Sequence, residues 1–247
     1  MIFIHKKRGE SSHRTHLISK YREMAKEHNK TLVHFIHIGK TGGTAVKHAI
    51  GIKGKAYTDT KQIIIGHKHS FSLEDVPVGE KCFFFLRDPI DKFISAFYSR
   101  KRKGMPRIYH EWNKEEKKAF SSFSTANELA RALDSEDEKE KNNAAGAMNS
   151  IDHIRSSYWN WFIDKDYFLS RKSDIIFIGN QKQLNADFIK LKNILDLPDH
   201  LHLPSDPVKM HKNPEKIEKH LDDQSIENLR LWYAKDYEFL EIASSLY

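Results

Sequence analysis

The 247-residue sequence contains a single cysteine, Cys82. One cysteine can neither form an intramolecular disulfide nor supply a cysteine-based zinc cage. Because Cys82 lies in the apolar run CFFFL, we expect it to be a buried core thiol and not a nucleophile.

Long hydrophobic runs are also missing. No stretch approaches the roughly 18 consecutive apolar residues that a membrane-spanning helix needs. The N-terminus reaches a basic cluster after MIFI, without the apolar segment of a secretory signal. We therefore expect no integral membrane segment, and a cytoplasmic protein or a soluble catalytic domain cut from a longer one.

Negative charge is in the minority. The chain has 41 Lys and Arg against 34 Asp and Glu, a formal net charge of +7. Such an excess favours anionic partners, for example a phosphorylated co-substrate, an acidic glycan or a nucleic acid. The sequence has no zinc finger, no basic helix with heptads and no aromatic RNA-binding pattern, so we expect no nucleic-acid partner.

Short apolar runs rich in β-branched and aromatic residues predict four buried strands, at 31–38, 62–67, 81–88 and 174–180. The first, third and fourth are followed by segments with helical spacing. After the third, Asp88 is placed to cap a helix and Pro89 to occupy its first turn. The alternation predicts an α/β fold, P-loop-like and three-layered, with a central mostly parallel β-sheet flanked by helices. Ligands are expected at the carboxyl ends of the strands.

We expect a basic N-terminal arm or peripheral helix over 1–30, followed by one domain over 31–247. Within the domain, residues 99–145 form a charged insertion. Its first half is a candidate acceptor-binding region, whereas the acidic stretch at 134–143 is expected to be a solvated, mobile loop. Two further segments, 155–170 and about 224–243, are each expected to form one core helix.

The first predicted strand feeds the turn GKTGGT. A turn between a buried strand and a helix offers backbone N–H groups and the positive end of the helix dipole to an anion. Its glycines permit close approach, its threonines add hydroxyl donors, and its lysine supplies a charge. The lysine precedes the glycines, so the turn is not a Walker A loop; an ordinary glycine turn capped by threonine stays open. The candidate ligands are Gly39, Lys40, Thr41, Gly42, Gly43 and Thr44.

A second candidate phosphate site follows the strand predicted at 81–88. Arg87 stands at its end, where a planar guanidinium can bind a phosphate through two hydrogen bonds. Ser95 lies eight residues later, on a polar stripe of the next helix that is distinct from its apolar face. Both side chains could hold one anion. Seen in isolation, the segment also fits an arginine that caps local carbonyls and a serine that faces water.

Together, HIGKTGGT and LRDPIDKFISAFYSR resemble the sulfotransferases that use 3′-phosphoadenosine 5′-phosphosulfate (PAPS), particularly carbohydrate sulfotransferases of the heparan-sulfate 2-O type. The resemblance covers about residues 31 to 242. It implies that the first motif holds the 5′-phosphosulfate, that Lys40 assists the leaving phosphate, and that Arg87 and Ser95 hold the 3′-phosphate. The C-terminal segment MHKNP implies that Lys212 approaches the nucleotide. Many members have proline where this chain has Gly39.

Sulfuryl transfer also needs a group that removes the acceptor's proton. IIIGHKHSF ends the second predicted strand, at the same sheet edge as the phosphate turn. In related enzymes that modify a 2-hydroxyl, a similar Gly-His carries the catalytic histidine, which makes His67 the candidate base. The alternatives are His69 and an acidic residue, Glu74 or one within 105–120. His67 and His69 could instead form a metal pair, but no third ligand accompanies them at convincing spacing.

The sequence thus predicts an enzyme that transfers a sulfuryl group from PAPS, as a co-substrate, to a hydroxyl of an acceptor by in-line displacement, with no metal. The acceptor is expected to be a saccharide or glycan, neutral or anionic. Two alternatives remain: a P-loop nucleotide-dependent kinase, although an acidic magnesium site is missing, and a non-catalytic module that binds anionic glycans. The acceptor's identity is not encoded in a transferable way, because loops determine it.

Overall fold

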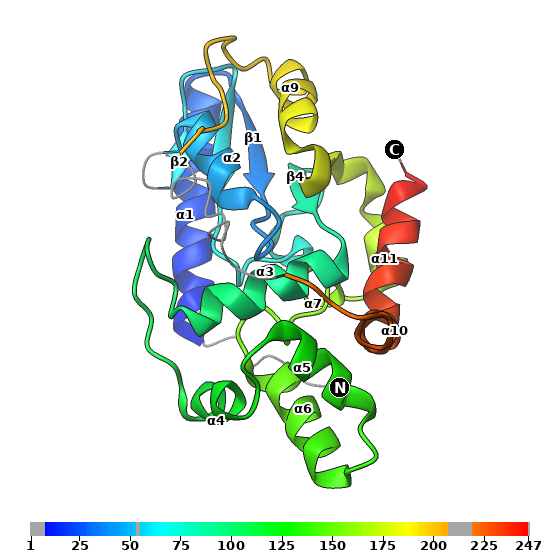
Figure 1. Ribbon diagram of the computed structural model, residues 1–247. Helices are drawn as coiled ribbons and strands as arrows, with labels where there is room; N and C mark the ends of the chain where they lie inside the picture. Colours follow the sequence, from blue (N-terminus) through cyan, green and yellow to red (C-terminus); the bar gives the residue numbers. More distant parts are fainter. Residues whose placement is uncertain (1–7, 53–54, 207–218, 247) are drawn as a thin grey trace.

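The computed structural model describes residues 8–52, 55–206 and 219–246 (Figure 1). Within them, a five-stranded sheet has the strand order β2–β3–β1–β4–β5. Its parallel strands are β1 (Thr31–Phe35), β3 (Gln62–Gly66), β4 (Lys81–Leu86) and β5 (Ile175–Asn180), and the short β2 (Ala56–Tyr57) pairs antiparallel with β3 at the edge. The four predicted strands and the mostly parallel sheet are confirmed.

The strands form where the sequence is apolar on both sides of the pleat, as a sheet covered on both faces requires. Phe83, Phe84 and Phe85 of β4 are fully buried, and so is Cys82. Burial raises the pKa of the Cys82 thiol to about 12. The thiol therefore stays protonated at neutral pH, in agreement with its predicted place in the core.

Helices cover both faces of the sheet. On one face, α2 (Gly43–Ile50) and α9 (Leu184–Ile194) pack against alternate strand residues such as Phe35 and Phe85. The other face is covered by α1 (Arg8–Glu27), α7 (Trp159–Phe162), α8 (Lys165–Ser170) and α11 (Ala234–Ser244). These layers confirm the predicted three-layer α/β fold.

A further group of helices lies beyond the carboxyl ends of the strands. It begins with α3 (Pro89–Lys101), whose N-terminus is capped as predicted: the Asp88 side chain accepts hydrogen bonds from the first turn, and Pro89 occupies that turn. Figure 1 shows β1 pointing toward α3 and the group beyond it. The helices that share a core with α3 are α4 (Lys114–Ser122), α5 (Ala126–Arg131), α6 (Glu138–Ser150) and α10 (Asp223–Trp232).

The structure corrects the mobile loop expected over 134–143, because most of that stretch forms the start of α6. Asp137 caps the helix by accepting from the Lys139 N–H. Acidic residues in a first turn are favoured by the helix dipole. The buried residues of α6 come later in the chain; they are Ala144, Ala147 and Met148. Local composition therefore suggested disorder, although the segment is held by packing.

The two predicted aromatic and C-terminal helices are each divided in two. Over 155–170, α7 ends at Phe162, because the next residue, Ile163, has a φ of 68° that cannot continue a right-handed helix, and α8 follows. Over 224–243, α10 and α11 meet at Tyr233. The predicted apolar residues are in the core, but the direction of the chain changes between them.

The sheet topology places the functional edge. The chain leaves β1 through α2 toward β3, and it leaves β4 through α3 toward β5. Neighbouring strands whose connections depart in opposite directions open a crevice at their carboxyl ends. That crevice lies between β1 and β4, where the two candidate phosphate motifs begin.

Within the described residues, we find no helix with the length and apolar character needed to cross a membrane.

Candidate functional site

The turn between β1 and α2 has the backbone of an anion site. Gly42 is the N-cap of α2 with a φ of 89°, and Lys40 has a φ of 66°. A lysine in this left-handed region stores about 1–3 kcal/mol of strain, which is typical of functional turns. Among the described residues, no side chain caps the N-terminus of α2. The Ala45 and Val46 N–H groups donate to the Gly42 carbonyl, so the N–H groups of Gly43 and Thr44, together with the helix dipole, are the ones that an anion could use.

Two glycines of the turn make room for histidines. A Cβ at Gly43 would lie 2.2 Å from Cδ2 of His37, and a Cβ at Gly39 would lie 2.5 Å from Nδ1 of His153. Neither distance is tolerable, so both positions require glycine for packing. The absence of a side chain at Gly39 thus lets the His153 ring lie against the turn.

The two threonines of the turn differ in what they offer. Thr41 is buried, and its hydroxyl donates to the carbonyl of Ile38 at 3.0 Å, so this hydrogen holds the turn together. Thr44 is half-buried, and its hydroxyl oxygen accepts from Nη1 of Arg107 at 3.3 Å. Because accepting leaves its own hydrogen free to donate, Thr44 is the better placed hydroxyl ligand for an anion.

Arg87 joins the second motif to the turn. Its Nη1 donates to the carbonyl of Lys40 at 3.3 Å. The Tyr158 hydroxyl accepts from the Arg87 N–H and donates to the Arg87 carbonyl, which fixes the backbone. Nε of Arg87 is buried, without a hydrogen-bond partner among the described residues. A buried unsatisfied donor costs about 1–3 kcal/mol, so this nitrogen indicates an anionic ligand.

The positive charges of Lys40 and Arg87 lie close enough to repel each other. Burial, followed by the charge of Arg87, lowers the pKa of Lys40 to about 7. Two neighbouring cations in a partly dry crevice are the arrangement that a bound anion would relieve. Ser95 is buried on the polar stripe of α3 with Lys92 and Ser99. The predicted ligand Lys212 lies outside the described residues.

His67 belongs to a buried polar chain. Its Nε2 lies 3.0 Å from Nδ1 of His34, and Nε2 of His34 lies 2.7 Å from a carboxylate oxygen of Glu80. Glu80 in turn accepts from Nε of Arg22 on α1. The His67 ring stacks on Phe71, with 3.4 Å between centroids. One ring nitrogen of the predicted base is therefore engaged toward α1.

His69 is exposed and its tautomer is fixed. Nδ1 lies 2.7 Å from the carbonyl of His37, and since a carbonyl only accepts, Nδ1 carries the hydrogen. Partial desolvation lowers the pKa of His69, and Lys47 and Lys40 lower it further against the opposing hydrogen bond to His37. The ring is thus neutral at pH 7, with the lone pair on Nε2. This is the state that a general base requires.

A cavity of about 460 Å³ opens beside the turn. Thr44 and His69 line it from the sheet edge, and Asp152 and His153 line it from the segment after α6. The remaining wall is the end of α3 together with residues 104–116, the first half of the charged insertion. A polar cavity of this size accommodates a small ligand or one part of a polymer.

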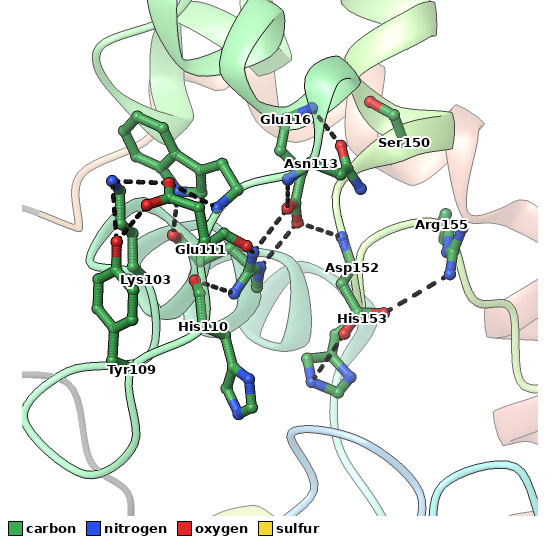
Figure 2. Close-up of polar contacts among 12 residues, drawn as sticks. Lys103, Tyr109, His110, Glu111, Asn113, Glu116, Ser150, Asp152, His153 and Arg155 are labelled. Atoms are coloured by element: carbon green, nitrogen blue, oxygen red, sulfur yellow. Dashed lines mark hydrogen bonds and ion pairs between the residues drawn. The ribbon is translucent and has the colours of Figure 1, made fainter.

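The buried ion pair of Arg100 and Glu116 holds the walls of the cavity together; Figure 2 shows the contacts around Glu116. The guanidinium donates to both carboxylate oxygens, at 2.7 and 2.6 Å, and to the carbonyls of His110 and Glu111. The carboxylate also accepts from the Asp152 N–H at 3.2 Å. Although burial opposes them, these hydrogen bonds keep the pKa of Glu116 below its ordinary value.

The sequence model of the Sulfotransferase family matches residues 24–242. The chain belongs to the sulfotransferase family. No curated protein matches it. The match begins in α1 and ends in α11, so it includes every part of the site described above. Membership implies a transferase that moves a sulfuryl group to a hydroxyl-bearing acceptor.

The acidic alternatives to a histidine base are Glu74 and the glutamates within 105–120 of the sulfotransferase. Glu74 is exposed in the short helix Leu73–Asp75. Glu111 is exposed, and hydrogen bonds from Lys103 and Tyr109 hold its pKa near 2. Glu115 is exposed in α4, and Glu116 is committed to Arg100. Neither Glu111 nor Glu116 has the raised pKa that a carboxylate base would need at neutral pH.

Sequence reasoning missed Asp152 and His153 of the sulfotransferase. His153 has a φ of 66°, and its Nε2 lies 3.6 Å from a carboxylate oxygen of Asp152. Burial lowers the pKa of His153 to about 3, although Asp152 opposes the shift. The local sequence SIDHIRSS carries no motif. The one available cue was the glycine at position 39, whose missing Cβ makes room for the ring.

Proposed function

We propose that this sulfotransferase transfers the sulfuryl group of PAPS to a hydroxyl of a saccharide. The buried, unpartnered Nε of Arg87 beside Lys40 carries this proposal. PAPS presents two anionic groups, the 5′-phosphosulfate and the 3′-phosphate, and the crevice between β1 and β4 supplies cations for both. A nucleoside triphosphate has no 3′-phosphate and would leave the Arg87 guanidinium without an anionic ligand.

The donor is assigned to the crevice by charge and geometry. N–H groups of the first turn of α2 and the Thr44 hydroxyl hold the phosphosulfate, and Arg87 and Ser95 take the 3′-phosphate. Lys40 lies at the junction, where it stabilises the charge that develops on the leaving phosphate oxygen. An approaching anion favours the protonated ammonium, so donor binding charges Lys40 before transfer.

We assign the base to His69 in preference to His67. The acceptor oxygen forms a bond to sulfur while the bond from sulfur to the bridging phosphate oxygen breaks, and that electron pair leaves with 3′-phosphoadenosine 5′-phosphate (PAP). The acceptor's proton goes to Nε2 of His69. His69 lines the cavity and its Nδ1–H is held by the His37 carbonyl, whereas Nε2 of His67 is directed to His34.

The cavity lined by His69, His153 and residues 104–116 is the proposed acceptor site. It adjoins Thr44, so an acceptor hydroxyl there lies next to the donor's sulfuryl end. Its polar lining suits a saccharide, whose hydroxyls need hydrogen-bond partners. This assigns acceptor recognition to the first half of the charged insertion.

The test is PAP formation from PAPS in the presence of a panel of neutral and acidic oligosaccharides. At least one saccharide should accelerate PAP formation, and Lys40→Ala should reduce the rate about 100-fold or more because transition-state charge is left unpaired. Arg155→Ala, which removes an exposed cation near the cavity, serves as the control. Consumption of ATP and not of PAPS would support a kinase instead.

A further inference from the structure

The loop of residues 102–113, between α3 and α4, forms one wall of the acceptor cavity. Its two ends are fixed: Arg100 donates to the carbonyls of His110 and Glu111, and the His110 N–H donates to the Lys103 carbonyl at 2.7 Å. Figure 2 shows this base of the loop beside Glu116. These hydrogen bonds hold the base of the loop in place.

The side chains at the tip of the loop do not pack into a hydrophobic core. Met105, Ile108 and Tyr109 are 46%, 52% and 55% exposed. Arg107, in the middle of these residues, is also exposed. Its guanidinium crosses to the phosphate turn, where Nη1 donates to the Thr44 hydroxyl 63 positions away in the chain. Arg107 thus connects the 102–113 loop, which lines the cavity, with the turn between β1 and α2.

The charge of Arg107 adds to an already cationic point. Burial is the largest cause of the lowered pKa of Lys40 and of His37, and Arg107 contributes to both in the same direction. Asp152 opposes the shift of Lys40. The cations that act on Lys40 are Arg87, which follows β4, and Arg102 and Arg107 of the 102–113 loop. An anion between them would be stabilised from both segments.

We infer that Arg107 binds the sulfonate end of the donor, so that donor binding fastens the 102–113 loop and completes the acceptor site. The inference rests on the proposed function. Thr44 adjoins the position assigned to the phosphosulfate, and a guanidinium 3.3 Å from its hydroxyl reaches sulfonate oxygens by a small rotation. Arg87 and Arg107 then divide the donor: the first takes the 3′-phosphate and the second takes the transferred group.

This division predicts different responses to PAPS and to PAP, which lacks the sulfonate. Arg107→Ala should weaken PAPS binding about tenfold, the value of one charge-assisted hydrogen bond, and should leave PAP binding within about twofold. Arg107→Lys, which keeps the charge, should recover part of the loss. Arg155→Ala is the matched control, because it removes an exposed arginine that contacts Asp152 but does not line the cavity. Isothermal calorimetry without acceptor provides the measurement.

The loop itself supplies a second readout. Hydrogen exchange of the amides in residues 104–110 should slow more with PAPS than with PAP, and Arg107→Ala should abolish the difference. Equal weakening of PAPS and PAP, or unchanged PAPS affinity with only a raised acceptor KM, would overturn the inference. Failure of the unaltered protein to bind either nucleotide would instead overturn the proposed function, so the two failures are distinguishable.

Discussion

At the scale of single residues, the site combines histidines and a lysine whose pKa values are lowered. Burial lowers the pKa values of His37 and His153, and partial desolvation lowers that of His69; nearby cations act in the same direction. Lys40, with a pKa of about 7, is only partly charged at neutral pH. The free site therefore holds neutral histidine rings beside cations, and His69, which lines the cavity, keeps the lone pair on Nε2 that the proposed base needs.

His69→Ala should lower kcat by a factor of about 100 to 10,000 through loss of the general base, with PAP affinity unchanged. His67→Ala breaks the contact with His34 and should mainly lower the melting temperature. Steady-state kinetics and thermal unfolding separate the two effects. Near-normal turnover by His69→Ala together with a collapse in His67→Ala would return the role of base to His67.

The assignment of His69 as the base also predicts how activity depends on pH. Because the pKa of His69 is lowered, the neutral ring persists as the pH falls, and activity is lost only when the pH drops through the lowered value. The acid limb of kcat/KM for the donor should therefore lie below 6.5, the ordinary histidine value. An acid limb above that value would contradict the assignment.

At the scale of elements, the phosphate turn depends on the glycine that begins α2. Gly43→Ala would place a Cβ 2.2 Å from the His37 ring, displacing the residue whose carbonyl holds His69. Overpacking of this kind costs about 1–3 kcal/mol of unfolding free energy, and PAP binding should weaken as well. Urea denaturation and calorimetry provide the measurements.

Gly146 is the matched control for this change. It lies within α6, and a Cβ there meets nothing within 4 Å. Gly146→Ala should therefore stabilise the protein by up to about 1 kcal/mol, since alanine favours a helix interior. If both substitutions had the same effect, the turn would not be constrained by His37.

The walls of the cavity depend on one buried ion pair. Glu116→Gln leaves the Arg100 guanidinium buried without its charge partner and should cost about 3–5 kcal/mol of unfolding free energy. Glu111→Gln removes a carboxylate of the exposed pair with Lys103 and should change the free energy of unfolding little. Equal losses in urea denaturation would show that the Arg100–Glu116 pair does not hold these elements.

Some elements could be predicted and others could not, for local reasons. The strands follow from β-branched and aromatic runs, and α3 follows from Asp88 and Pro89 at its start. The start of α6 is hidden by its acidic first turns, and the break at Ile163 depends on a backbone angle that no motif announces. Local sequence thus encodes how an element begins more clearly than what it packs against.

The same distinction holds for the site. The meeting of Lys40 and Arg87 could be predicted, because parallel strands β1 and β4 end at one edge. The choice between His67 and His69 could not, since it depends on which carbonyl or ring each nitrogen meets. His153 comes from a segment without a motif, and only the folded chain places it against Gly39.

At the scale of the whole molecule, the proposed function gives the sheet and the α3 helical group separate tasks. The crevice between β1 and β4 would bind the donor, and the cavity formed with the helices beyond it would bind the acceptor. Lys40, Arg87 and Arg107 lie close enough for the charges of both arginines to lower the pKa of Lys40. The central claim is that this point binds a nucleotide with a 3′-phosphate.

Calorimetry with PAP and with adenosine 5′-phosphate, which lacks only the 3′-phosphate, tests that claim most directly. PAP should bind at least about tenfold more tightly. Arg87→Ala should remove this advantage, and Arg155→Ala should retain it. Equal affinities for the two nucleotides, or an advantage for PAP that survives Arg87→Ala, would contradict the account.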